Sequence, residues 1–158
     1  MSTLPRPAPE FTLPCITADG ESAEITLSAL RPAPVVLFFY PRDNTSGCTK
    51  ESQAFSHLLP EFNALGTKVF GISKDSLKSH ARFIDKQELT IPLLSDENGT
   101  TCEDYGVWQE KKMYGKTHMG IVRSTFLIDA KGEIVKDWPK VKVDGHAEEV
   151  LAALKDMG

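Results

Sequence analysis

The segment VVLFFY, residues 35–40, is an uninterrupted apolar run, and it constrains the fold more than any other part of the chain. A strand with one solvent-facing side alternates apolar and polar residues, so a continuous run indicates a strand that is covered on both faces. Covering both faces requires a layer above the sheet and a layer below it. The run therefore predicts an α/β chain with its sheet inside.

The residues that follow predict a βαβ unit. Apolar residues recur at helical spacing after residue 48, namely Phe55, Leu58, Leu59, Phe62 and Leu65. Gly66 is expected to end this helix. Pro60 is expected to kink it or break it into two helices, because proline lacks an N–H. KVFGIS, residues 68–73, then supplies a second strand, parallel to the first.

The remaining patterns extend this unit at both ends. The first ten residues are expected to be extended, and Asp75 is expected to cap a helix that reaches Lys86. The other expected elements are a hairpin over 11–27, a short strand in PLLS, a short helix in TTCEDYGV, a hairpin formed by RSTFLID and GEIVKDW, and a helix over 146–155. This order predicts a thioredoxin-like three-layer sandwich with a mixed central sheet, as a single domain over residues 1–158.

The composition argues against several classes of function. The net charge of −4 gives no electrostatic footprint for nucleic acid, and no apolar run is long enough to span a membrane. The N-terminal residues do not resemble a signal peptide, and three cysteines are an odd number for a disulfide framework. A cytoplasmic location is therefore expected.

Cys48 lies where the chain leaves the apolar strand and a helix is expected to begin. Catalytic groups gather beyond the carboxyl ends of such strands, and the unpaired N–H groups of a helix N-terminus favour a thiolate over a thiol. Gly47 allows another molecule to approach the backbone, and Pro41 fixes the direction of the chain. The Thr45 hydroxyl can hydrogen-bond the thiolate or an incoming oxygen. An inert buried thiol is the alternative, but the position favours a reactive one.

The spacing of Pro41, Thr45 and Cys48, written P-x-x-x-T-x-x-C, resembles the active-site signature of the peroxiredoxins. Specifically, it resembles the bacterioferritin comigratory protein or peroxiredoxin Q group. The resemblance covers nearly the whole chain, through APEFTLP, KVFGISKDS, PLLSD, YGVWQEKKMYGK, GIVRSTFLIDAKG and KVKVDGHAEEVLAAL in that order. One departure lies inside the motif, because the group usually has proline at the position of Ser46.

This resemblance implies a thioredoxin fold and an antioxidant thiol peroxidase, with Cys48 reducing hydrogen peroxide and organic hydroperoxides and becoming sulfenic acid. It also implies an arginine from a distant strand, which RSTFLID supplies as Arg123, and a guanidinium beside the sulfur favours the thiolate. Gly47 and Glu51 are candidate substrate-binding residues. Glu51 has two interpretations, as a helix cap or as the residue that holds Arg123. No metal or organic cofactor is implied.

The chain departs from its relatives at the positions of the resolving cysteine, which are occupied by Gln53 and Ile84. The expected cycle therefore uses one cysteine, and an external thiol such as thioredoxin, glutaredoxin or glutathione reduces the sulfenic acid. A two-cysteine cycle through Cys102 or Cys15 is the alternative, although each is more simply interpreted as a small buried residue. A monomer is expected.

Two other functions on the same fold are weaker hypotheses. Dithiol exchange needs a C-x-x-C pair, and Glu51 occupies the second position. A non-enzymatic peroxide sensor or chaperone would not need the full set of Pro41, Thr45, Cys48 and Arg123. The four histidines show no spacing typical of a metal site, and two of them, His57 and His80, are expected on helix surfaces.

Overall fold

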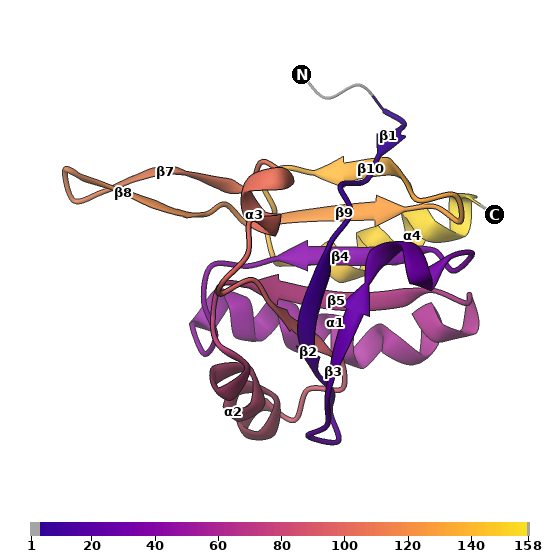
Figure 1. Cartoon of the computed structure of the whole chain (residues 1–158), viewed down its shortest axis with the longest axis horizontal. Helices are drawn as coiled ribbons and strands as arrows, with labels where there is room; N and C mark the ends of the chain where they lie inside the picture. Colours follow the sequence, from indigo (N-terminus) through magenta and orange to yellow (C-terminus); the bar gives the residue numbers. More distant parts are fainter. Residues whose placement is uncertain (1–3, 158) are drawn as a thin grey trace.

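The computed structural model describes residues 4–157 and contains an eight-stranded sheet (Figure 1). Its strand order is β1-β10-β9-β4-β5-β6-β2-β3. The strands are β1 Arg6–Pro7, β2 Thr12–Ile16, β3 Ser22–Thr26, β4 Val35–Phe39, β5 Lys68–Ser73, β6 Leu93–Ser95, β9 Ser124–Ile128 and β10 Glu133–Trp138. Among the described strands, only the pairs β4–β5 and β5–β6 are parallel, so the predicted mixed sheet is confirmed. The N-terminus was expected to be extended, and this is confirmed for Arg6–Pro7, which form β1. Residues 1–3, which the same expectation covers, lie outside the described residues.

Helices and a second small sheet complete the chain. The helices are η1 Leu27–Leu30, α1 Ser46–Ala64, α2 Leu77–Gln87, α3 Thr101–Asp104 and α4 His146–Met157. Strands β7 Trp108–Met113 and β8 Lys116–Ile121 form a separate hairpin that projects from the body on the left of Figure 1. The sequence analysis did not predict this hairpin, because its residues are mostly polar and charged and lack the apolar alternation of a half-buried strand.

Strand β4 divides the core into two clusters because successive side chains point to opposite faces. Val36, Phe38 and Tyr40 pack in a cluster with residues of α1, α2 and α4. Val35, Leu37 and Phe39 pack in a second cluster with Cys15, Cys102 and their neighbours. All five residues of β4 are buried, as the apolar run predicted, and the layers match a three-layer sandwich.

Helix α1 continues through Pro60 as one helix, so of the two predicted outcomes, a kink or a break into two helices, the break is wrong. Proline cannot donate to the carbonyl four residues earlier, which belongs to Ser56. In this structure that carbonyl instead accepts a hydrogen bond of 3.1 Å from the Thr90 hydroxyl. A contact from a distant segment therefore satisfies the group that Pro60 leaves without a partner.

The predicted cap of α2 is also wrong. Ser76, not Asp75, is the N-cap, and its hydroxyl accepts from the Ser79 backbone N–H at 3.1 Å. The Asp75 carboxylate accepts instead from the backbone N–H of Asp43 and from the hydroxyl of Ser73, at 2.8 and 2.7 Å. The Asp75 carboxylate therefore binds the loop at Asp43 and the end of β5, and it does not cap α2 as its position in the sequence had suggested.

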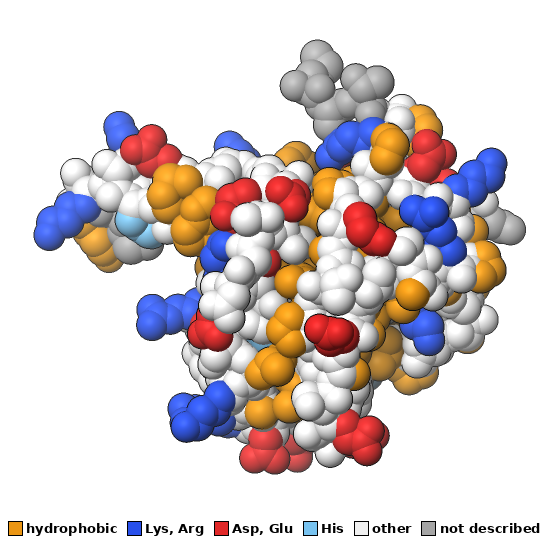
Figure 2. All heavy atoms as spheres, viewed as in Figure 1, with side chains coloured by type: hydrophobic (Ala, Val, Ile, Leu, Met, Phe, Trp, Pro, Cys, Tyr) orange, Lys and Arg blue, Asp and Glu red, His pale blue; other side chains and the backbone are white. Residues whose placement is uncertain are grey.

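The exterior is mixed in charge. On the face seen in Figure 2, basic, acidic and apolar side chains are interspersed. Between residues 4 and 157, no helix combines the length and the apolar character that crossing a membrane requires.

Candidate active site

Cys48 is the third residue of α1 and lies in its first turn, directly beyond the carboxyl end of β4. Thr45 is the N-cap, and its carbonyl accepts the first helical bond, from the Thr49 N–H at 2.9 Å. The Thr45 hydroxyl makes no capping bond and donates to the Arg42 carbonyl at 2.9 Å. The helix N-terminus that the sequence predicted for Cys48 is therefore present, and Thr45 shapes the loop before it.

Arg123 reaches Cys48 because of the sheet register. Ser124, the first residue of β9, pairs with Phe39, the last residue of β4, so the residue before β9 lies beside the loop that leaves β4. Nη2 of Arg123 donates to Sγ of Cys48 at 3.4 Å. The structure thus brings together two residues that lie 75 positions apart in the sequence.

Glu51 holds the other side of the same guanidinium. Its Oε1 accepts from Nη1 of Arg123 at 2.7 Å, and its side chain is 1% exposed. Burial raises the pKa of Glu51 to about 7, although the charge of Arg123 opposes this shift. Burial also lowers the pKa of Arg123, but the nearby Glu51 and Cys48 outweigh it, so the guanidinium pKa lies above its ordinary value.

Gly47 lies against Arg123 and leaves room for it. A side-chain carbon at this position would lie 3.0 Å from Nη2 of Arg123, closer than most such contacts. Gly47 therefore permits the guanidinium to approach the sulfur of Cys48.

The side chain of Cys48 is fully buried in this structure. Next to it, Pro41 and Arg42 line a pocket of about 320 Å³ that also involves Trp108, Lys111 and Ile121. A reactant in this pocket lies against Pro41 and Arg42, in the loop that precedes Cys48.

The other two thiols are not brought to this site. Cys15 in β2 and Cys102 in α3 are buried in the cluster on the opposite face of β4 from Cys48. Burial raises the pKa of Cys15 to about 11, and burial together with Asp96 raises that of Cys102. In this structure both thiols therefore lie away from Cys48, and burial disfavours their thiolate forms.

The sequence analysis missed a buried polar cluster behind the loop. His80 was expected on the surface of its helix, and this is wrong, because His80 is 0% exposed. Its Nδ1 lies 2.8 Å from Oδ2 of Asp43. The helical spacing could have indicated that His80 is buried, because residues 77, 80 and 84 lie on one face of α2. His57, by contrast, is exposed as expected.

The same cluster contains the group of side chains best suited to a metal ion among the described residues. One ligand atom each from Asp43, Asp75 and His80 lies within 4.8 Å of the others. These atoms already hydrogen-bond to protein groups, Asp43 to His80 and Asp75 to the Asp43 backbone. The cluster is therefore explained as a hydrogen-bond network.

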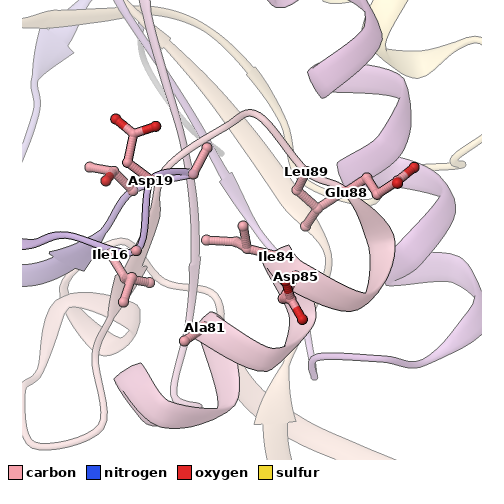
Figure 3. Close-up of a pocket in the computed structure, with 10 residues that line it drawn as sticks. Ile16, Asp19, Ala81, Ile84, Asp85, Glu88 and Leu89 are labelled. Atoms are coloured by element: carbon pink, nitrogen blue, oxygen red, sulfur yellow. The ribbon is translucent and has the colours of Figure 1, made fainter.

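A larger pocket, of about 440 Å³, lies elsewhere, between the β2–β3 turn and α2 (Figure 3). Ile16, Ile84 and Leu89 form its apolar part, and Asp19 and Glu88 are among its acidic residues. Cys48, Thr45 and Arg123 do not line it. Unlike the smaller pocket, it is lined by no residue of the loop that precedes Cys48, so we do not assign it to the chemistry of Cys48.

Comparison with known proteins gives a consistent family. The AhpC/TSA family matches residues 4–137. Peroxiredoxin Bcp of Xanthomonas campestris is 47% identical over 154 residues, which cover 98% of this chain and 95% of that protein. Peroxiredoxin Bcp of Bacillus subtilis is 42% identical, and the match covers 91% of this chain and 92% of that protein.

Solved structures agree with this match. A peroxiredoxin Q mutant from Xanthomonas campestris superposes with a TM-score of 0.84 at 47% identity and covers 92% of each chain. A PrxQ mutant from Xylella fastidiosa superposes with a TM-score of 0.85 at 40% identity and covers 99% of each chain. The fold is thus the thioredoxin-like fold of these proteins. The chain belongs to the AhpC/TSA family, as a peroxiredoxin of the bacterioferritin comigratory protein and peroxiredoxin Q group, and it is a thiol-dependent peroxidase.

Proposed function

We propose that Cys48 is the residue that the peroxide oxidises. The thiolate attacks one peroxide oxygen in line with the O–O bond, the S–O bond forms and the O–O bond breaks. Cys48 becomes sulfenic acid, and the departing oxygen takes up a proton and leaves as water or as an alcohol. The observation that carries this proposal is the Arg123 guanidinium at 3.4 Å from Sγ.

Arg123 has two roles in this proposal. Its positive charge favours the thiolate over the thiol, and its N–H groups stabilise the negative charge that moves toward the departing oxygen. Glu51 keeps the guanidinium in place through the bond at 2.7 Å. The Cys48 N–H is a further donor that we assign to the reacting oxygens. The Thr45 hydroxyl donates its one proton to the Arg42 carbonyl, so we assign it as an acceptor for the O–H of the peroxide. Pro41 and Gly47 shape the loop around them.

The substrates that we propose are hydrogen peroxide and organic hydroperoxides. The pocket beside the loop has apolar walls at Trp108 and Ile121, which suit an alkyl group. A solved structure of the Xanthomonas campestris bacterioferritin comigratory protein addresses its alkyl peroxide reduction activity, and it superposes on this chain with a TM-score of 0.83. Both points support an organic substrate.

An external thiol completes the proposed cycle. It attacks the sulfenic sulfur, displaces water and leaves a mixed disulfide, which a second thiol then reduces. Thioredoxin, glutaredoxin or glutathione would supply these thiols. The burial of Cys15 and Cys102 on the other face of β4 supports this one-cysteine cycle over a two-cysteine cycle. We further propose that the protein acts as a monomer in the cytoplasm, without a metal or an organic cofactor.

The test is peroxide consumption with dithiothreitol as the reductant. Cys48→Ser should abolish it, and Arg123→Ala should lower the rate roughly a hundredfold, the effect of about 3 kcal/mol of lost transition-state stabilisation. Cys102→Ser and Arg82→Ala are matched controls that change the same residue types away from the loop. Equal rates for Cys48→Ser and the unmodified protein would refute the assignment of Cys48.

A further inference from the structure

The buried carboxylate of Asp43 joins the loop that precedes Cys48 to its neighbours through several hydrogen bonds. Its Oδ1 accepts from the Tyr40 hydroxyl at 2.6 Å. Its Oδ2 accepts from the Ser79 hydroxyl at 2.8 Å and lies 2.8 Å from Nδ1 of His80. The three partners come from the end of β4 and from α2, so the carboxylate joins the loop to a helix that lies more than thirty residues further along the chain.

His80 is the partner from α2 that lies deepest in the protein. Nε2 of its ring faces the backbone carbonyl of Leu94 in β6 at 2.9 Å, and a carbonyl only accepts, so Nε2 carries a proton. Nδ1 faces a carboxylate oxygen of Asp43 at 2.8 Å. Burial and the neighbouring Asp43 raise the pKa of Tyr40 well above its ordinary value, which keeps its hydroxyl a donor to the same carboxylate.

The backbone of the loop is fixed at the same point. The Asp43 N–H donates to Oδ2 of Asp75 at 2.8 Å, and that oxygen also accepts from the Ser73 hydroxyl at the end of β5. Asn44, the next residue, has a φ of 61°, in the left-handed region that asparagine adopts more readily than most residues. Thr45 is then the N-cap of the helix that carries Cys48. The conformation of the loop is thus set at Asp43, two residues before this N-cap.

We propose that Asp43 and His80 are positioning residues of the peroxidase reaction, and that their contact holds the loop in the conformation that keeps Cys48 against Arg123. This inference rests on the proposed role of Cys48. Neither residue touches the reacting atoms. When the contact breaks, the loop loses its most deeply buried attachment to α2 and keeps only those to Ser79 and Gln87. Cys48 then leaves the guanidinium more readily, and its sulfur becomes exposed.

The two halves of the cycle place opposite demands on this contact. The peroxide step needs Cys48 at 3.4 Å from Arg123, where the sulfur is buried. Reduction of the sulfenic acid needs the sulfur to be accessible to a thiol. The Asp43–His80 contact therefore sets the balance between a conformation that reacts with peroxide and one that reacts with the reductant.

Two variants of His80 separate its two hydrogen bonds. The amide nitrogen of asparagine can occupy the place of Nδ1, so His80→Asn retains a donor to Asp43 and loses the bond to Leu94. The longer side chain of glutamine places its amide near Nε2, so His80→Gln retains the bond to Leu94 and loses the bond to Asp43. Both variants remove the ring from the same buried position, so they are matched in their structural cost.

Two rates are measured at a temperature where every variant is folded. One is the second-order rate of Cys48 oxidation by hydrogen peroxide, and the other is the rate of Cys48 alkylation by iodoacetamide, mapped by mass spectrometry. For His80→Gln we expect the oxidation of Cys48 to slow about tenfold or more, because the reaction slows when a catalytic group is displaced from its productive position. We expect the alkylation of Cys48 to become severalfold faster. For His80→Asn we expect both rates to return toward those of the unmodified protein.

His57→Gln, on the exposed face of α1, is the control for loss of a histidine. Tyr40→Phe removes a different donor from the Asp43 carboxylate and should change both rates in the same directions by a smaller factor, so it decides the matter if His80→Gln does not fold. Equal rates for the two His80 variants, or slower oxidation without faster alkylation, would overturn the proposal. If Cys48→Ser still consumed peroxide, the proposed function would fail, whereas the alkylation comparison would still test the contact.

Discussion

Glu51 shows how a single residue can have a role that its local sequence leaves open. The sequence left helix capping and the holding of Arg123 as alternatives. Helix α1 begins at Ser46 and has no acidic residue in its first turn, so Glu51 lies too far into the helix to cap it. The structure places its carboxylate on the guanidinium at 2.7 Å. The second oxygen, Oε2, is buried and has no hydrogen-bond partner within residues 4–157. Because burial outweighs the single ion pair, the pKa of Glu51 rises to about 7.

This raised pKa predicts an unusual pH dependence of stability. Between pH 4.5, the ordinary pKa, and about 7, the folded protein keeps a proton on Glu51 that the unfolded chain has released. The free energy of unfolding therefore falls as the pH rises through this window, the opposite of an ordinary salt-bridged carboxylate. Glu51→Gln does not titrate. The free energy of unfolding of each protein is measured in urea from pH 4 to pH 8. The value for the unmodified protein minus the value for Glu51→Gln should decrease as the pH rises. An increase would contradict the prediction.

At the scale of elements, α1 depends on a segment that is remote in sequence. Pro60 removes the donor that the Ser56 carbonyl would have in a regular helix, and the Thr90 hydroxyl replaces it. The Ser56 hydroxyl in turn accepts from the backbone N–H of Thr90 at 3.0 Å. Because both contacts join α1 to the segment between α2 and β6, they help to seat the helix that carries Cys48.

A double-mutant cycle measures this replacement. Thr90→Val should lower the free energy of unfolding by about 0.5–1.5 kcal/mol, because the Ser56 carbonyl loses its donor. In a Pro60→Ala background the alanine N–H can donate to that carbonyl, so the same Thr90→Val change should cost less. Urea denaturation of the four proteins gives both costs. If Thr90→Val is equally costly with and without Pro60, the hydroxyl does not serve the carbonyl in this way.

At the scale of the whole molecule, the sheet separates the thiols. Cys48 packs with α1, α2 and α4 on one face of β4, and Cys15 and Cys102 pack on the other face. A disulfide between the two faces would require the sheet to open, since the strands between them are buried and hydrogen-bonded. The layered architecture therefore favours reduction by a thiol from outside.

This separation predicts the products of oxidation. After one equivalent of hydrogen peroxide without reductant, mass spectrometry with dimedone as the trap should find sulfenic acid on Cys48 and free thiols at the other two cysteines. A variant with Cys15→Ala and Cys102→Ala together should keep its peroxide turnover with dithiothreitol. An intramolecular disulfide from Cys48 to Cys102 or to Cys15 would show that the cycle uses two cysteines.

Most of the fold could be predicted because its elements have strong local patterns. The apolar run of β4 and the helical spacing in α1 gave a βαβ unit, and the P-x-x-x-T-x-x-C spacing indicated Cys48 and, through the family resemblance, Arg123. The predictions failed where a residue has two compatible local roles. Asp75 could cap a helix or bind the loop, and Pro60 could break a helix or be tolerated within it.

The sequence by itself determined which segments form the sheet and which sulfur lies at a helix N-terminus, because these properties depend on residues close together in the chain. Only the tertiary structure decided that His80 is buried against Asp43, that Glu51 holds Arg123, and that the other thiols lie across the sheet from Cys48. These contacts join residues far apart in sequence, and their energies depend on burial and on distance, which no local pattern contains.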